Sequence, residues 1–139
     1  MTSETAPVAS DEMLIRLIWE SFFKPDDSLP VRPSAFNPRT SETDGISVFR
    51  LACMTSAIKA LDVIAEEKRS RYAIVMIPAS EIFKLGLTVL PAPIDAVEGH
   101  AVIPELNCVR KVADPNACQE IQMALAQLAS ANIVRVPTA

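Results

Sequence analysis

The sequence predicts a single α+β domain in which one mixed β-sheet is covered by two or three helices. Residues 72–77 form a continuous apolar run rich in β-branched side chains, which is typical of a strand buried on both faces. Residues 114–131 have the apolar spacing of a helix, and the segment opens with a capping Asp followed by Pro. The chain has 139 residues, 50% of them hydrophobic, which suffices for one core.

The first third of the chain predicts a tail, one apolar element and a long loop. Residues 1–10 are small and polar, so we expect a disordered tail and a domain over 11–139. The apolar run 13–19 fits a strand or a helix, because apolar residues occupy both faces, and its shortness favours a strand. A proline-dotted loop follows as far as Gly45, and we expect it to be partly packed because it holds Phe36.

Residues 46–51 alternate apolar and polar side chains, which predicts a half-buried strand. Residues 55–67 predict a helix whose apolar face carries Ile58, Leu61 and Ile64.

Short elements are expected on either side of the prolines in the second half. A helix over 79–85 ends where Gly86 can serve as its C-terminal cap. Strands are expected at 87–90, at 100–103 and, after the last helix, at 133–136.

Composition excludes several classes of function. A net charge of −4 without a large basic cluster argues against a nucleic-acid surface. The three isolated glycines cannot build either of the common glycine-rich nucleotide loops. No apolar run approaches the ~18 residues that span a bilayer, and the first residues lack the pattern of a secretory signal. We therefore expect a cytoplasmic protein with no cofactor, no metal, no membrane association and no nucleic-acid partner.

The cysteines predict neither a disulfide framework nor a zinc site. Cys53, Cys108 and Cys118 are odd in number and contain no C-x-x-C spacing. We interpret them as small buried hydrophobic residues in a reducing compartment.

His100 is the only histidine, so any histidine-based acid–base chemistry falls to it. It follows Gly99 at the start of a predicted strand, which is a reasonable place for a functional side chain. The alternative, which we favour, is a histidine that caps the loop or packs on the surface.

The loop over 32–39 is the second candidate site. Its polar members can bind a phosphate or carboxylate, with arginine as a bidentate donor. The candidate binding residues are Arg32, Phe36, Asn37 and Arg39, and Ser34 is a candidate catalytic residue. In the alternative, which we also favour, Phe36 anchors the loop and the arginines pair with acidic neighbours.

Four short motifs resemble a group of small uncharacterised bacterial proteins. They are Arg32-Pro33-Ser34-Ala35-Phe36, Ile46-Ser47-Val48, Leu85-Gly86-Leu87 and Gly99-His100-Ala101-Val102, and the likeness covers about residues 14–104. The resemblance implies that the Ser34 and His100 regions belong to one site, but it brings no established activity. The helix at 114–131 has no counterpart in the group, so we interpret it as a partner-binding addition.

The order of elements is also similar to ADP-ribosyltransferase-like folds, which bind NAD without glycine-rich loops. Neither Glu81 nor Glu105 has the setting of the catalytic glutamate that such enzymes use. In this enzyme alternative, Arg32 would hold an anionic group of the substrate, and Ser34 and His100 would converge with it in one cleft.

The main functional hypothesis is association with another protein or with a second copy of the chain, for instance in a toxin–antitoxin or phage-defence setting. It depends mostly on the absence of catalytic motifs, and whether the chain is an enzyme stays open. The expected interface lies on the last helix, where Glu120 is the only charge around the apolar stripe. Met123, Ala126 and Gln127 are its candidate contact residues, and the alternative is that this helix simply covers the sheet.

Overall fold

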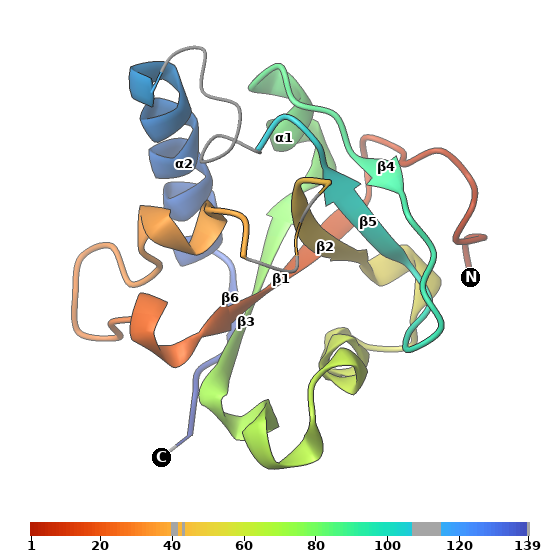
Figure 1. Cartoon of the computed structure of the whole chain (residues 1–139), viewed down its shortest axis with the longest axis horizontal. Helices are drawn as coiled ribbons and strands as arrows, with labels where there is room; N and C mark the ends of the chain where they lie inside the picture. The colour runs from red at the N-terminus through yellow and green to blue at the C-terminus, as the bar shows by residue number, and fades with distance from the viewer. Residues whose placement is uncertain (40–41, 43, 107–114, 139) are drawn as a thin grey trace.

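The computed structural model describes residues 1–39, 42, 44–106 and 115–138. Six strands form one sheet in the order β4-β5-β2-β1-β3-β6, and helices pack against it (Figure 1). The strands are β1 Met13–Trp19, β2 Ile46–Arg50, β3 Tyr72–Pro78, β4 Leu90–Pro91, β5 His100–Ile103 and β6 Ile133–Arg135. The α-helices are α1 Ala79–Lys84 and α2 Pro115–Ser130. Short 3-10 helices are η1 Glu20–Phe22, η2 Pro33–Phe36, η3 Leu51–Cys53, η4 Ala57–Val63 and η5 Glu66–Arg71.

The α+β class is confirmed, but the predicted mixing of strand directions is not. Every pair of neighbouring strands within the described residues is antiparallel. β2 and β3 run in the same direction, and β1 lies between them, so they do not become parallel neighbours.

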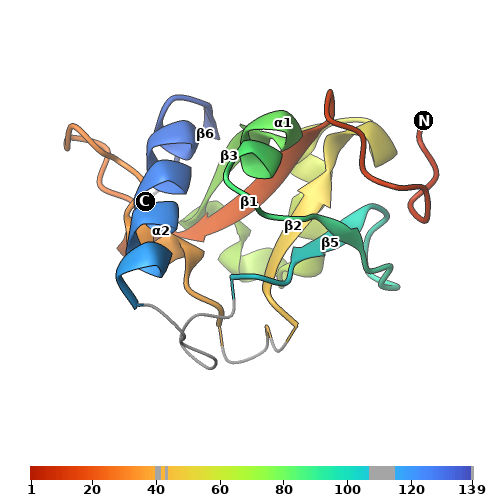
Figure 2. The same cartoon turned by 90° about the horizontal axis from the view of Figure 1, so that it is seen from above.

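The two faces of the sheet bury different sets of side chains. The face covered by α1, α2 and η2, here called the α-helical face, carries Leu14, Ile18, Val48 and Val75. The opposite face, here called the 3-10 face, carries Ile15, Leu17, Phe49 and Ile74 and packs against η4. In Figures 1 and 2, α1 and α2 lie against the sheet, and η4, drawn in yellow-green, lies away from these two helices. The apolar runs of β1 and β3 follow from this two-sided burial.

The predicted helix over 55–67 is wrong. The chain forms η4 and η5 there, and the backbone of Ile64 between them is extended. A 3-10 turn of three residues directs Ala60 and Leu61 inward. Ile58, expected on the apolar face of a helix, is therefore 54% exposed. The strand predicted at 87–90 is likewise reduced to the two residues of β4.

The last helix is confirmed over α2, and Asp114 lies outside the described residues. Its buried side carries Leu125, Ala126 and Ala129 together with the polar Gln122. The Gln122 amide donates to the Phe36 carbonyl and the Asn37 side-chain oxygen. The apolar spacing of the sequence instead predicts a buried stripe of Ile121, Ala124, Leu125 and Leu128, so the helix is rotated from that stripe. Ala126, predicted at a partner interface, is fully buried and is not available to a partner.

The N-terminal residues bind around Arg50, which differs from the disordered tail that the sequence predicts. The Arg50 side chain is fully buried and forms a bidentate pair with Glu12, with both N···O distances at 2.8 Å. Its remaining donors bind the backbone carbonyls of Ser3, Glu4, Ala6 and Pro7. A buried guanidinium has five N–H donors to satisfy, and the N-terminal carbonyls supply the acceptors.

The two cysteines within the described residues differ in state. Cys53 is a buried free thiol, and burial raises its pKa. Cys118 is disulfide-bonded, contrary to the expectation for it, and Cys108 lies outside the described residues.

No helix within the described ranges is long and apolar enough to cross a bilayer.

We expect Val75→Asp to lower the free energy of unfolding by about 4 kcal/mol or more, because an unpaired carboxylate would be buried. Val75 is fully buried in β3, whereas Val134 in β6 is 47% exposed and provides a matched control. Urea unfolding of the two Val→Asp variants measures the difference. Equal stability of both variants would contradict the interior position of β3.

Candidate functional site

A gap opens between β1 and β2 where their pairing stops. The two strands are in register only at Leu14 with Arg50 and at Ile15 with Phe49. Further along β2, the Ser47 N–H donates to Glu42 Oε2 at 2.6 Å, and the Ser47 carbonyl accepts from Arg16 Nη1 at 2.8 Å. An ion pair of side chains thus supplies the partners that a continued β-ladder would otherwise give.

The ion pair between Arg16 and Glu42 is buried and multiply bonded. Arg16 Nη1 lies 2.6 Å from one Glu42 oxygen, and Nη2 lies 3.3 Å from the other. The two side chains are only 4% and 7% exposed. Arg16 Nη2 also donates to the Ala35 carbonyl at 2.9 Å, which fastens η2 to the sheet. One guanidinium therefore joins β1, β2 and the long loop after β1.

The pKa of Glu42 is lowered by its surroundings. Burial opposes ionisation, but it is outweighed by the attraction and hydrogen bonds of Arg16 and by the backbone N–H groups of Arg39 and Ser47. Glu42 is therefore an ionised partner of Arg16 near neutral pH.

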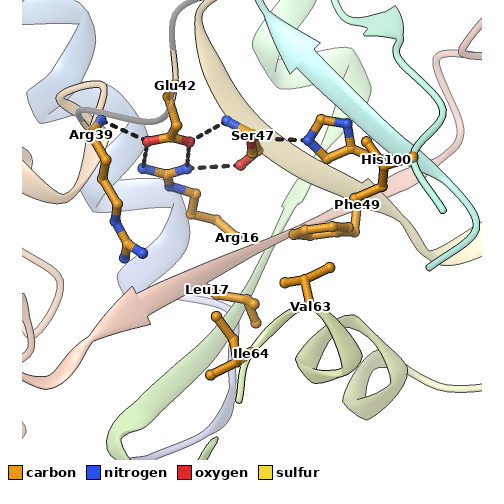
Figure 3. A pocket seen from close by; sticks show the side chains of 10 residues that line it. Arg16, Leu17, Arg39, Glu42, Ser47, Phe49, Val63, Ile64 and His100 are labelled. Carbon is orange, nitrogen blue, oxygen red and sulfur yellow. Dashed lines mark hydrogen bonds and ion pairs between the residues drawn. The ribbon is translucent and has the colours of Figure 1, made fainter. Parts of the chain in front are cut away.

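Ser47 and His100 form a hydrogen-bonded pair next to this ion pair (Figure 3). His100 lies opposite Phe49 in the β2–β5 ladder, and its ring lies 5.4 Å from the Phe49 ring, centroid to centroid. His100 Nδ1 is 2.6 Å from the Ala92 carbonyl, which can only accept, so Nδ1 carries a proton. In the neutral ring Nε2 is then the acceptor, and the Ser47 hydroxyl donates to it at 3.0 Å.

These residues line a cavity of about 230 Å³ on the 3-10 face. Its polar wall consists of Arg16, Arg39, Glu42, Ser47 and His100. Its apolar wall includes Leu17, Phe49, Val63 and Ile64, which lie on the other side of the space in Figure 3. The cavity therefore combines converging polar groups with an apolar floor, as small-molecule sites do.

The Nε–H of Arg16 is a donor in a demanding position. It is buried and has no hydrogen-bond partner among the described residues. A buried donor of this kind lowers the stability of the fold unless an acceptor forms a hydrogen bond with it. The Arg39 guanidinium also lines the cavity, and it lies over the Tyr72 ring at 5.5 Å and donates to the Tyr72 hydroxyl at 3.4 Å.

The fold places only some of the predicted site residues at the cavity. His100 and Arg39 line the cavity, whereas Arg32 and Ser34 are not among the described residues that do so. Arg32 pairs with Asp27 at the surface, as the structural alternative expects. Phe36 is fully buried in the core of the α-helical face.

Arg16, Glu42 and Ser47 are the cavity residues that the sequence analysis does not single out. Arg16 carries the only charge in an otherwise apolar strand, and a charge in a buried strand requires a partner. Ser47 occupies a polar position in the alternating pattern of β2. The partner Glu42 has no comparable signal, because several acidic residues lie in the same loop.

No protein-family model, no curated protein and no solved structure was found to match the chain. Function must therefore be inferred from the chemistry of the cavity.

We expect Glu42→Gln to lower the free energy of unfolding by roughly 3–5 kcal/mol, because Arg16 would be left as an uncompensated buried charge. Glu120→Gln, at an exposed position of α2, is the control and should have little effect. Denaturant unfolding near neutral pH measures both.

The same pair predicts acid sensitivity. Both Glu42 and Glu12 have pKa values below 4.5 in the folded state. Their stabilising contributions are complete above the ordinary pKa and are lost as the pH falls through the lower folded values. Between about pH 5 and about pH 3, unfolding free energy should therefore fall less steeply in Glu42→Gln than in the Glu120→Gln control. Identical slopes would contradict the assigned pairing.

Proposed function

We propose that the chain binds a small organic acid, a carboxylate on a compact apolar body, in the cavity beside Arg16 and Ser47. The observation that carries this proposal is the polar wall of the cavity, to which Arg16 and Arg39 contribute two positive charges together with the Ser47 hydroxyl. A carboxylate oxygen is a strong acceptor for a guanidinium donor, and the charge-assisted bond is stronger than a neutral one.

The charge of the lining supports an anion over a cation. Two arginines and one glutamate give the wall a formal charge of +1, with His100 counted as neutral. Glu42 is already engaged by Arg16, so the ion pair can position donors without itself attracting a cation. The hydroxyl of Ser47 and the ring of His100 add polar contacts at the same wall.

The size of the cavity limits the ligand. A cavity of about 150 Å³ accommodates benzene, and this one measures about 230 Å³. A single ring or a short branched alkyl group with one carboxylate therefore fits, whereas a dinucleotide such as NAD does not. The ADP-ribosyltransferase alternative receives no support from this cavity.

We expect benzoate and isobutyrate to bind more tightly than their neutral isosteres benzamide and isobutyramide. Arg39→Gln should weaken binding of the acids about tenfold, equivalent to ~1.4 kcal/mol, because one charge-assisted donor is lost. Arg32→Gln is the matched control, since Arg32 is an exposed arginine that pairs with Asp27. Titrations followed by NMR shifts of the Ser47 and His100 amides give the dissociation constants.

Equal affinity for acids and amides would overturn the choice of ligand class. Shift changes confined to residues outside the cavity, or equal losses in the Arg39 and Arg32 variants, would overturn the site.

A second candidate function, association with another protein or a second copy of the chain, depends on the exposed side of α2. Met123 is 42% exposed, and Gln127 beside it is also exposed. A shallow hollow of about 500 Å³ lies on the same side and is lined by Met123 and Gln127 together with Gln119, Glu120 and Ala124. The toxin–antitoxin or phage-defence setting and the cytoplasmic location stay predictions.

If α2 mediates self-association, Met123→Glu should shift the sedimentation coefficient toward that of a monomer without changing the melting temperature. Ile58→Glu is the control, because Ile58 is 54% exposed on η4 rather than on α2. Identical sedimentation of the native chain and both variants would exclude self-association through this side of α2.

A further inference from the structure

We infer that Ser47 is a nucleophile activated by His100, and that the cavity cleaves esters of the small acids it binds. The inference rests on the proposed function for its substrate class, since the acyl group of the ester would occupy the position of the acid. Its geometric basis is separate from the charge of the cavity and lies in the Ser47–His100–Ala92 chain of hydrogen bonds.

The three groups stand in the order that nucleophilic catalysis requires. The Ser47 hydroxyl donates to His100 Nε2 at 3.0 Å, within reach for proton transfer. The Ala92 carbonyl holds the other ring nitrogen at 2.6 Å and so fixes the tautomer in which Nε2 is basic. The same carbonyl would stabilise the imidazolium that forms after proton transfer, because its oxygen faces the Nδ1–H.

The nucleophile is also held rigidly. Both backbone groups of Ser47 are bound by the buried ion pair, the N–H by Glu42 and the carbonyl by Arg16. The hydroxyl is therefore free to take part in chemistry while the backbone stays in place. Such preorganisation lowers the cost of reaching a reactive geometry.

The reaction can be written with all atoms and protons accounted for. Ser47 Oγ attacks the ester carbonyl carbon, its proton passes to His100 Nε2, and a new Oγ–C bond forms. The C–O bond to the alcohol breaks, and the departing oxygen takes the proton from Nε2. Water then attacks the acyl-Ser47 carbonyl and gives a proton to Nε2. The Oγ–C bond breaks as Ser47 recovers that proton, so one ester and one water give one acid and one alcohol.

A donor is needed for the oxygen that becomes negative in the tetrahedral intermediates. Arg16 and Arg39 line the same cavity, and their positive charges can stabilise this oxygen. Product acid and ester carbonyl would then face the same positive charge, which links binding to cleavage.

The test uses p-nitrophenyl isobutyrate with the full chain. We expect a transient isobutyryl adduct on Ser47, located by peptide mass spectrometry after acid quenching, together with release of p-nitrophenol. His100→Gln should slow acylation about a hundredfold or more, because the general base is lost. Ser47→Ala should abolish the adduct and keep its fold, because the backbone bonds to Glu42 and Arg16 remain. Ser34→Ala, at an exposed serine outside the cavity lining, should behave as the native chain.

The outcomes separate this inference from the proposed function. If the native chain binds isobutyrate but forms no adduct, or forms one elsewhere, Ser47 is not a nucleophile and the binding function stands. An adduct on Ser47 whose rate is unchanged in a folded His100→Gln variant overturns the role of His100. An adduct on Ser47 in a chain that does not bind isobutyrate supports the nucleophile and overturns the proposed ligand class.

Discussion

The buried ion pair between Arg16 and Glu42 is the interaction on which the rest of the site depends. It lies where β1 and β2 part, and it supplies the hydrogen bonds that the ladder no longer gives to Ser47. Burying two charges is costly, and the arrangement persists only because nearly every polar atom is bonded. The exception is the Arg16 Nε–H, which is buried and has no hydrogen-bond partner among the described residues.

A second buried pair has the same construction at the other end of the β1–β2 ladder. Arg50 comes from a strand and Glu12 from the segment before one, as with Arg16 and the loop residue Glu42. The Arg50 guanidinium also binds backbone carbonyls of the N-terminal segment, and the Arg16 guanidinium binds the carbonyls of Ala35 in η2 and Ser47 in β2. The N-terminal segment and η2 are thus fastened to the sheet by charged side chains, where apolar burial alone would give no directional bond. Because each carboxylate has a lowered pKa, both fastenings weaken together in acid.

Several parts of the fold could be predicted because local physics and tertiary context agree. The apolar run of β3 has the composition of a two-sided strand, and the Asp-Pro start of the last helix is a strong local signal. The segment over 55–67 fails because helical spacing cannot distinguish a continuous α-helix from short 3-10 turns that follow the sheet surface. The prediction of the buried side of α2 is wrong for another reason. Gln122 is drawn inward by the Phe36 carbonyl and Asn37, which only the folded loop presents.

The sequence by itself determined the α+β class, most strand positions and the isolation of His100 as the single histidine. It also placed Arg39 among the candidate binding residues, although it could not say which polar neighbours His100 and Arg39 would share. The tertiary structure decided that Ser47 rather than Ser34 meets His100, because the β2–β5 register places Ser47 and His100 on one face. It also decided that Glu42, among the acidic residues of the loop, pairs with Arg16. The partner of a buried guanidinium is the carboxylate that the folded chain places next to it. Pairings across a sheet depend on register and long-range contacts, and neither is encoded in a local pattern of residues.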